Sequence, residues 1–411
     1  MSGGIVIIGA SHAGVQVATS LRDFGYEGVI TLINGEAAYP YQRPPLSKGV
    51  LYGGVDIESL SFRSPKYYTD KSIDIVNNTW VTEIDRTGKK VTVKRCDSES
   101  SITEYHFDHL VIATGALAKP LSVPGGDLPN VICIRSIEDA LRLKEIFLSS
   151  KSVVIAGAGF IGLEVASTLV KLGIKSTVIV RGKHLLSRLF PSVMSDFLIK
   201  KHQAAGSHFL FNSQIVKIEK DQGSNVIVYL DDGQVLHADA VVVGIGTTVS
   251  DELARSIGLL CNDGVVVDES CVTSDPSISA CGDCSVWKQS DQGTPSRIES
   301  VQTAVDQAKT IAARLTGAVL PERVAPWFWS DQLDLKLQMV GTELEYDDLI
   351  CRGEIASNKF SLLYFQGESL VRVDSINSAA DHIAARKLVS KNAKISKELA
   401  KQPSIKLKDF L

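Results

Sequence analysis

Two glycine-rich turns, each directly after a short apolar run, constrain this chain more than any other feature. The first, Gly9-Ala-Ser-His-Ala-Gly14, follows residues 5–8, and the second, Gly157-Ala-Gly-Phe-Ile-Gly162, follows residues 153–156. A strand, a tight glycine turn and a helix N-terminus together direct backbone N–H groups and the helix dipole at a pyrophosphate. Each copy therefore predicts a strand–turn–helix unit that binds a dinucleotide.

The two copies are in register. A shift of 148 positions places Gly9 on Gly157 and Gly14 on Gly162, and the apolar positions of the following helix also coincide. One such pattern is a weak indication, because glycine turns also join ordinary strands and helices. Two registered copies favour two Rossmann-like domains in one chain.

Composition and charge narrow the class further. A chain of 411 residues with 44% apolar and 22% charged residues is typical of a globular protein of two or three domains. A net charge of −4 argues against nucleic acid as the main partner. We expect no membrane span, because the longest apolar stretch, residues 152–173, contains Glu164 and Lys171. The N-terminal residues show no signal-peptide pattern, which predicts a cytoplasmic location.

The order of the expected elements predicts an α/β fold with one domain inserted within another. Buried strands at residues 110–115 and 240–246 close two similar segments, and the residues after Pro326 alternate like antiparallel strands. We predict a discontinuous FAD-binding domain, an NAD(P)H-binding domain and a C-terminal α+β domain. Their predicted bounds are 1–115 with 238–322, 116–237, and 323–411.

Two local patterns need an interpretation. Residues 39–48 contain three prolines and many polar groups, so we expect an irregular loop that lines a cleft. Cys281 and Cys284 have the spacing of a redox or metal pair, but no second pair stands at zinc-site spacing. We therefore predict free thiols without a redox role and no metal site.

Several longer motifs resemble the oxygenase-coupled, FAD-dependent ferredoxin reductases, the putidaredoxin reductase-like family with a glutathione-reductase-like fold. The resemblance covers nearly the whole chain. Besides the two glycine turns, the matching motifs are Tyr41-Gln-Arg-Pro-Pro-Leu-Ser-Lys48, Ala113-Thr-Gly115, Thr273-Ser-Asp-Pro276 through Gly282-Asp-Cys284, Arg297-Ile-Glu-Ser-Val301, and Pro326-Trp-Phe-Trp-Ser-Asp331.

The resemblance implies FAD on the first glycine turn. Ser11 departs from the usual middle glycine, and Gly35 stands where the class places a ribose-binding carboxylate, so Glu36 is the candidate for that role. Asp283 has the chemistry to accept hydrogen bonds from ribityl hydroxyls. The residues expected to bind FAD are Gly9, Ser11, Ala13, Gly14, Glu36, Lys48, Val81, Thr114, Gly115, Arg135, Asp283, Val301 and Trp329.

The resemblance also implies NADH or NADPH on the second glycine turn. Val180 stands where NADH-using members carry an acid, and a basic stretch begins at Arg181. A carboxylate repels a 2′-phosphate and an arginine attracts it, so local chemistry favours NADPH while the family habit favours NADH. The residues expected to bind the nucleotide are Gly157, Gly159, Phe160, Ile161, Gly162, Glu164, Arg181 and Gly246.

Three residues are expected to be catalytic. By resemblance, Lys48 stabilises negative charge on the reduced flavin and pairs with Glu164, and Trp329 lies beside the flavin ring. A glutamate in an apolar helix needs such a partner if it is buried. Packing of the third domain is the simpler alternative for Trp329.

The residues around Lys48 predict where the electrons go. Disulphide and peroxide reductases of this fold need a cysteine beside the flavin, and residues 41–48 contain none. The resemblance implies an external acceptor, a [2Fe-2S] ferredoxin that feeds a mono- or dioxygenase. Lys309, Arg314 and Lys336 are candidate docking cations. The alternatives are a thiol-free quinone or monodehydroascorbate-type reductase, and a nucleotide-sensing flavoprotein resembling apoptosis-inducing factor.

Overall fold

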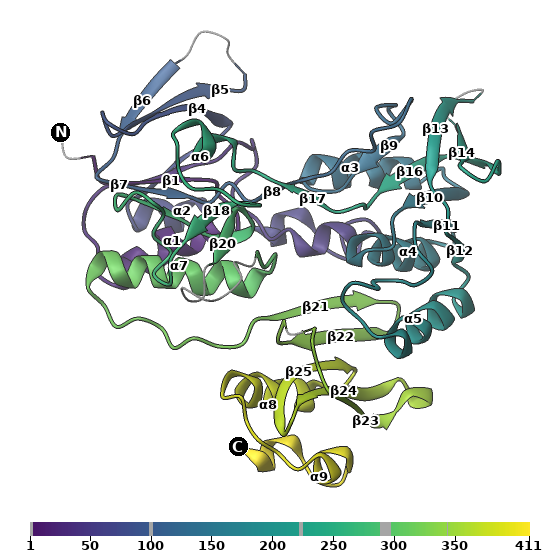
Figure 1. Ribbon diagram of the computed structural model, residues 1–411. Coiled ribbons are helices and arrows are strands. Elements are labelled where there is room, and N and C mark those ends of the chain that lie inside the picture. Colours follow the sequence, from purple (N-terminus) through teal and green to yellow (C-terminus); the bar gives the residue numbers. More distant parts are fainter. Residues whose placement is uncertain (1–2, 98–101, 222–224, 288–296, 343) are drawn as a thin grey trace. The chain divides into compact units, whose positions relative to one another are not determined.

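The computed structural model describes residues 3–97, 102–221, 225–287, 297–342 and 344–411. The chain, drawn in Figure 1, divides into two compact units by its internal contacts. Unit 1 comprises residues 1–42, 58–117 and 248–326, and unit 2 comprises residues 43–57, 118–247 and 327–411. The predicted division into three domains, with boundaries after residues 115, 237 and 322, stays a prediction.

Unit 1 is built on a parallel five-stranded sheet of order β19-β7-β1-β2-β3. Its strands are β1 (Ile5–Ile8), β2 (Ile30–Ile33), β3 (Ile73–Val76), β7 (His109–Ile112) and β19 (Ile278–Ala280). The first strand, Ile5–Ile8, is apolar throughout because both faces of a parallel sheet are covered. Helices α1 (His12–Asp23) and α7 (Val301–Thr316) pack against each other, and α1 also contacts β1 and β2.

Smaller elements complete unit 1. An antiparallel sheet of order β4-β5-β6 contains β4 (Thr79–Asp85), β5 (Lys90–Arg95) and β6 (Ile102–His106). A parallel pair contains β18 (Val265–Val267) and β20 (Ser285–Trp287). The helices are α2 (Pro65–Asp70), α6 (Glu252–Ser256), and the 3₁₀ turns η2 (Ile57–Leu60) and η3 (Gly282–Cys284). Strands β8 (Ala116–Ala118) and β17 (Thr247–Val249) span the points where the chain passes between the units.

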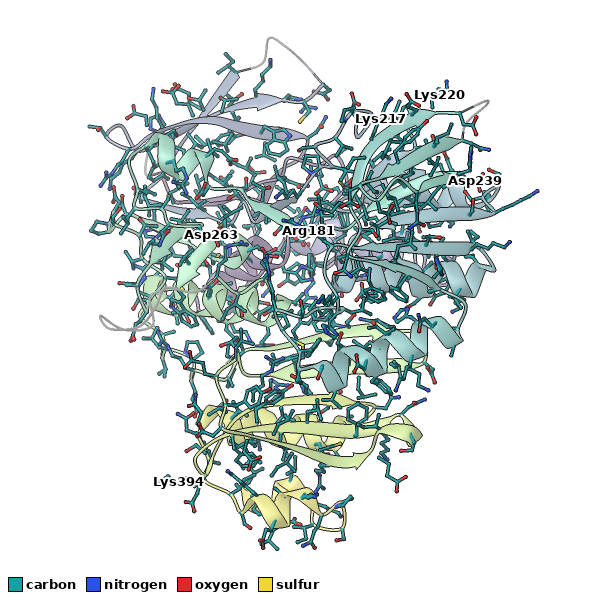
Figure 2. All side chains as sticks on the ribbon, turned by 45° about the vertical axis from the view of Figure 1, so that its right-hand side comes forward. Arg181, Lys217, Lys220, Asp239, Asp263 and Lys394 are labelled. Atoms are coloured by element: carbon teal, nitrogen blue, oxygen red, sulfur yellow. The ribbon has the colours of Figure 1, made fainter. Side chains whose placement is uncertain are left out.

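Unit 2 contains a second parallel sheet, of order β12-β11-β10-β16-β9. Its strands are β9 (Val131–Cys133), β10 (Ser152–Ala156), β11 (Lys175–Val180), β12 (His208–Phe211) and β16 (Ala240–Val243). The accompanying helices are α3 (Ile137–Phe147), α4 (Phe160–Leu172) and α5 (Ser192–Ala204). An antiparallel sheet, β13 (Ile215–Lys220), β14 (Val226–Leu230) and β15 (Val235–Ala238), carries Lys217 and Lys220 on β13 (Figure 2).

The C-terminal part of unit 2 is an antiparallel sheet of order β21-β22-β25-β24-β23 with helix α8 packed on β25 and β22 (Figure 1). Its strands are β21 (Trp327–Gln332), β22 (Leu335–Val340), β23 (Asp348–Glu354), β24 (Lys359–Gln366) and β25 (Ser369–Ile376). The helical elements are α8 (Ala379–Ser390), α9 (Lys397–Lys401), η4 (Ile355–Ser357) and η5 (Leu407–Phe410). The predicted fold class, two parallel dinucleotide-binding sheets with a C-terminal α+β part, is confirmed.

One local prediction is wrong. Residues 39–48 were expected to be irregular because of their prolines, but Pro44–Ser47 form a 3₁₀ turn, η1. Pro44 and Pro45 occupy the first two helical positions, where a backbone N–H has no partner within the helix in any case. The turn fixes the backbone just before Lys48.

A polar cluster in unit 1 joins His109, Ser279 and Arg314. His109 Nε2 lies 2.9 Å from Ser279 Oγ, and the guanidinium of Arg314 donates to the same Ser279 oxygen at 2.7 Å. Arg314 Nη2 also lies 3.3 Å from His109 Nε2. Arg314 is partly buried and its guanidinium is bound to these two side chains, and its role as a docking cation stays a prediction.

The same cluster predicts acid sensitivity. Burial, followed by the charge of Arg314, lowers the pKa of His109 from 6.5 to about 4. As the pH falls, the unfolded chain therefore takes up a proton on this histidine at a higher pH than the folded chain does. The stabilisation from keeping His109 neutral is complete above pH 6.5, and the free energy of unfolding falls as the pH falls towards 4. The loss is about 3 kcal/mol. Thermal unfolding of wild type and His109→Asn from pH 7.5 to 4.5 measures it, and parallel curves for the two proteins would contradict the assignment.

Among the described residues there is no helix whose length and hydropathy would let it cross a bilayer. Within the same part of the chain, no cluster of three or more His, Cys, Asp or Glu side chains has the arrangement of a metal site.

Candidate active site

The glycine turn of unit 1 is a cradle from which side chains are excluded. Gly9 has φ +104°, and a Cβ there would stand 2.3 Å from the carbonyl oxygen of Ala113. A Cβ on Gly14 would stand 1.8 Å from the carbonyl oxygen of Gly9. Helix α1 then begins without a side-chain cap from Ser11, so its first N–H groups are not satisfied by that residue. These features fit a pyrophosphate at the helix N-terminus.

The turn of unit 2 repeats this geometry. Gly157 has φ +99°, with its notional Cβ 2.5 Å from the carbonyl oxygen of Gly244, and a Cβ on Gly162 would stand 2.2 Å from the carbonyl oxygen of Gly157. Helix α4 begins at Phe160 after Gly159, which offers no side-chain cap. The structure thus fits a second dinucleotide at this turn.

The middle position of each turn explains why serine is tolerated in unit 1. Ser11 has φ −103° and ψ −157°, and Gly159 has φ −75° and ψ −179°. Both are extended conformations that any residue adopts. A Cβ on Gly159 would meet only the Gly244 carbonyl oxygen, at 3.7 Å. The departure at Ser11 therefore leaves the turn unstrained.

Glu36 is held in place near the end of β2. The hydroxyl of Tyr41 donates to Glu36 Oε2 at 2.5 Å, and the Glu36 backbone N–H donates to Asn34 at 3.3 Å. The neighbouring Gly35 lies against the indole of Trp80, 3.0 Å from a notional Cβ. A carboxylate is thus fixed one residue after the usual position, and its ribose contact stays a prediction.

The remaining residues predicted to bind FAD lie in both units. In unit 1, Gly282 has φ +77° and its notional Cβ is 3.0 Å from that of Ala13, which holds the backbone before Asp283 close to α1. Thr114 donates to the Ser250 carbonyl at 2.5 Å. Val81 is buried on β4, Gly115 precedes β8 with φ +70°, and Val301 begins α7. In unit 2, Arg135 directly precedes the N-cap residue of α3, and its backbone carbonyl accepts a hydrogen bond from Arg43 at 2.6 Å.

Unit 2 brings Lys48 and Glu164 together. Lys48 Nζ lies 3.0 Å from Glu164 Oε1, and the two side chains are 19% and 3% exposed. Glu164 Oε2 accepts from the Ser47 hydroxyl at 2.5 Å, and Oε1 accepts from the Ser330 hydroxyl at 2.7 Å. Burial raises the pKa of Glu164, and Lys48 and the two hydroxyls oppose that shift. The carboxylate is therefore the common acceptor of three donors.

Sequence reasoning missed Ser47, Ser330 and the groups behind them. The side-chain amide of Gln332 donates to Ser330 Oγ at 3.1 Å, and its Oε1 lies 3.1 Å from Nε2 of the buried His202. Alternation along β21 puts Ser330 and Gln332 on the buried face of an otherwise aromatic strand. That alternation was the available signal.

The aromatic side chains near the second turn pack within unit 2. The ring of Phe160 lies 4.6 Å from that of Phe328 and 6.2 Å from that of Phe190. Trp329 is half-buried and its ring lies 5.6 Å from Trp327. The other predicted nucleotide residues are Ile161, which is exposed in the first turn of α4, Arg181, which is exposed after β11, and Gly246, which has φ +105° and no atom within 4 Å of a notional Cβ.

The geometry defines a class of protein with two turns that fit dinucleotides and with no cysteine in η1. A family profile described as pyridine nucleotide-disulphide oxidoreductase matches residues 3–308, and one described as reductase C-terminal matches residues 327–411. The rhodocoxin reductase of Rhodococcus erythropolis is 41% identical over 404 residues, which cover 98% of this chain and 93% of that protein.

Two solved structures are similar over almost the whole chain. The ferredoxin reductase for the CYP199A2 system from Rhodopseudomonas palustris has a TM-score of 0.93 and 39% identity, covering 99% of each chain. The reductase of a covalent putidaredoxin reductase–putidaredoxin complex has a TM-score of 0.94 and 35% identity, covering 99% of this chain and 98% of that one.

This chain belongs to the pyridine nucleotide-disulphide oxidoreductase family, among the ferredoxin reductases that resemble putidaredoxin reductase. The prediction of an oxidoreductase of this family that uses FAD and NAD(P)H is confirmed. The roles of the individual residues stay predictions.

Proposed function

We propose that this protein is a cytoplasmic NAD(P)H:ferredoxin reductase that passes electrons singly to a [2Fe-2S] ferredoxin, which feeds a mono- or dioxygenase. The observation that carries the proposal is the η1 loop, which supplies Ser47 and Lys48 where a thiol-dependent reductase needs cysteine. The similarity to a reductase solved in complex with putidaredoxin supports a small carrier protein as the acceptor.

The residues of the two turns would hold the cofactors through backbone N–H groups. Bound FAD would supply a ring that can accept two electrons as a hydride from a nicotinamide and release them one at a time to a carrier protein. We assign Lys48 the role of a cation that stabilises negative charge on the reduced ring. Glu164 holds that ammonium in place, because Ser330 fixes the carboxylate oxygen that faces Lys48 and Ser47 fixes the other oxygen. Phe160 and Trp329 supply apolar surface that excludes water.

The experiment is a steady-state comparison on the holoenzyme. Cytochrome c reduction by NADH and by NADPH is measured with and without a [2Fe-2S] ferredoxin, and menadione serves as a quinone acceptor. Reduction that depends on the ferredoxin supports the proposal. Equal quinone reduction without ferredoxin favours a quinone-type reductase, and a long-lived charge-transfer band with slow turnover favours a nucleotide sensor.

Cys281 and Cys284 are expected to be bystanders in this reaction. Both are fully buried, and burial raises the pKa of each thiol, so neither provides a thiolate near neutral pH. Cys281→Ser and Cys284→Ser should therefore keep ferredoxin turnover per bound FAD within about twofold of wild type. Exposed Cys96→Ser is the control for substitution itself. A tenfold loss of ferredoxin turnover in the Cys281 and Cys284 variants, but not in the Cys96 variant, would indicate a redox role for the buried pair.

A further inference from the structure

The segment between β11 and α5, residues 181–191, forms a basic loop in unit 2. Arg181, Lys183, His184 and Arg188 are exposed, and the segment contains no acidic residue. His184 lies 3.8 Å from Asp196 on α5, and no ion pair is found for the other three cations among the described residues. Arg181, which is labelled in Figure 2, directly follows β11. In a Rossmann-like domain, a basic residue at this position after the second strand lies near the 2′-position of the adenosine ribose.

Although its cations are exposed, the loop has a fixed backbone. The carbonyl of Gly182 accepts from the Asn212 N–H at 3.2 Å. Leu185 is completely buried, and Leu186 takes a left-handed conformation with φ +50°. The N–H groups of Leu189 and Phe190 then both donate to the Leu186 carbonyl, at 2.8 and 3.1 Å. The loop is therefore a tight turn with a buried anchor.

Arg372 of strand β25 holds the other end of this turn. Its Nη2 donates to the Leu189 carbonyl at 2.7 Å, and its guanidinium lies over the ring of Phe190, 5.6 Å from the centroid. The side chain is only 2% exposed. A buried guanidinium with one hydrogen bond to a loop carbonyl joins the C-terminal sheet to the basic loop.

Two further buried groups set the orientation of Arg372. Asp374 accepts from Arg372 Nε at 3.0 Å and from Nη2 at 2.9 Å, and the Tyr364 hydroxyl donates to the same carboxylate at 2.5 Å. Burial raises the pKa of Asp374, and the adjacent guanidinium opposes that shift. A buried ion pair often adds little net stability, but it fixes one geometry. Here that geometry aims one guanidinium N–H at Leu189.

We propose that Arg372 is a positioning residue for nucleotide choice: it fixes the loop 181–191 so that Arg181, Lys183 and Arg188 receive the 2′-phosphate of NADPH. The proposal rests on nicotinamide nucleotide binding at the β10–α4 turn, which is part of the proposed function. Arg372 acts only through the loop backbone, since its guanidinium is directed at Leu189 and Asp374.

Binding of NADP⁺ and NAD⁺ to the oxidised holoenzyme is measured by calorimetry, without ferredoxin, alongside hydrogen exchange of the loop amides. Wild type is expected to bind NADP⁺ roughly tenfold more tightly than NAD⁺, because the 2′-phosphate gains charge-assisted hydrogen bonds. Arg181→Met should lose most of this preference and leave loop exchange unchanged. Arg372→Met should lower the preference by a similar factor and speed loop exchange about tenfold.

Arg352→Met is the matched control. Arg352 is also a buried arginine of the C-terminal sheet, paired with Asp381 and donating to the carbonyls of Ala400 and Ile405. It therefore resembles Arg372 in burial and bonding, but its carbonyl partners lie near the C-terminus. Its substitution should leave both the nucleotide preference and loop exchange unchanged.

If Arg372→Met does not fold, Arg372→Lys provides the same test, because a lysine cannot bridge Asp374 and Leu189 with a planar fork. An unchanged preference in a folded Arg372 variant would overturn the positioning role. Equal binding of NADP⁺ and NAD⁺ by wild type would overturn the 2′-phosphate site. If the wild-type holoenzyme binds NADP⁺ but does not reduce a [2Fe-2S] ferredoxin, the proposed function is rejected and this inference stands.

Discussion

Glu164→Ala is expected to destabilise unit 2 by about 3–5 kcal/mol, because removing one partner of a buried ion pair leaves the other uncompensated. The substitution takes the counter-charge from Lys48 and the acceptor from the hydroxyls of Ser47 and Ser330. Lys48 keeps one bond, to the Pro44 carbonyl at 3.1 Å. The result is measured as the shift of the urea unfolding transition, followed by far-UV circular dichroism.

Two companion variants make this result specific. Glu164→Gln keeps an acceptor for the hydroxyls and removes only the charge, so it should have a smaller effect than alanine. Glu145→Ala, at an exposed position of α3 in the same unit, should change stability by less than about 0.5 kcal/mol. If Glu164→Ala unfolds at the same urea concentration as Glu145→Ala, the carboxylate does not hold this network.

Gly9→Ala is expected to lower the affinity for FAD at least about tenfold. An alanine at this positive φ adds backbone strain of about 1–3 kcal/mol, which the turn relieves by shifting. Gly9 has φ +104°, and the new methyl group would stand 2.3 Å from the Ala113 carbonyl oxygen. Because a backbone carbonyl cannot move away alone, the turn must shift from the position that meets the pyrophosphate. FAD titration of apo-protein by calorimetry and the flavin-to-protein ratio measure the loss.

Gly25→Ala separates strain from crowding. Gly25 lies in the same unit with φ +86°, but no atom stands within 4 Å of its notional Cβ. It should therefore share the backbone strain and bind FAD with nearly wild-type affinity. The FAD assignment of the first turn fails if Gly9→Ala, folded by circular dichroism, binds FAD as tightly as Gly25→Ala does.

Local spacing made much of the fold predictable. Residues 5–8 and 153–156 are apolar because they are buried on both faces of a parallel sheet, and each run leads into a glycine turn and an amphipathic or buried helix. The 3₁₀ turn at Pro44–Ser47 was missed because proline was taken as a helix breaker, although the first helical positions accept it.

The candidate site was predictable only in part. A buried carboxylate in an apolar helix needs a partner, and the family resemblance implied that Lys48 is the partner of Glu164, which the structure pairs at 3.0 Å. Arg314 was assigned to the surface, and its contacts with Ser279 and His109 depend on how α7 packs on the sheet of unit 1. A charged side chain carries no local signal of whether it will be exposed.

The sequence by itself determined that the chain holds two dinucleotides and offers no thiol in residues 41–48, because turn geometry and residue chemistry are encoded over a few neighbouring positions. Only the tertiary structure decided which groups share a carboxylate or a carbonyl. Ser47 and Ser330 reach Glu164 across 117 and 166 positions, and Arg372 reaches Leu189 across 183. Such contacts arise from the packing of distant elements, which no local pattern specifies.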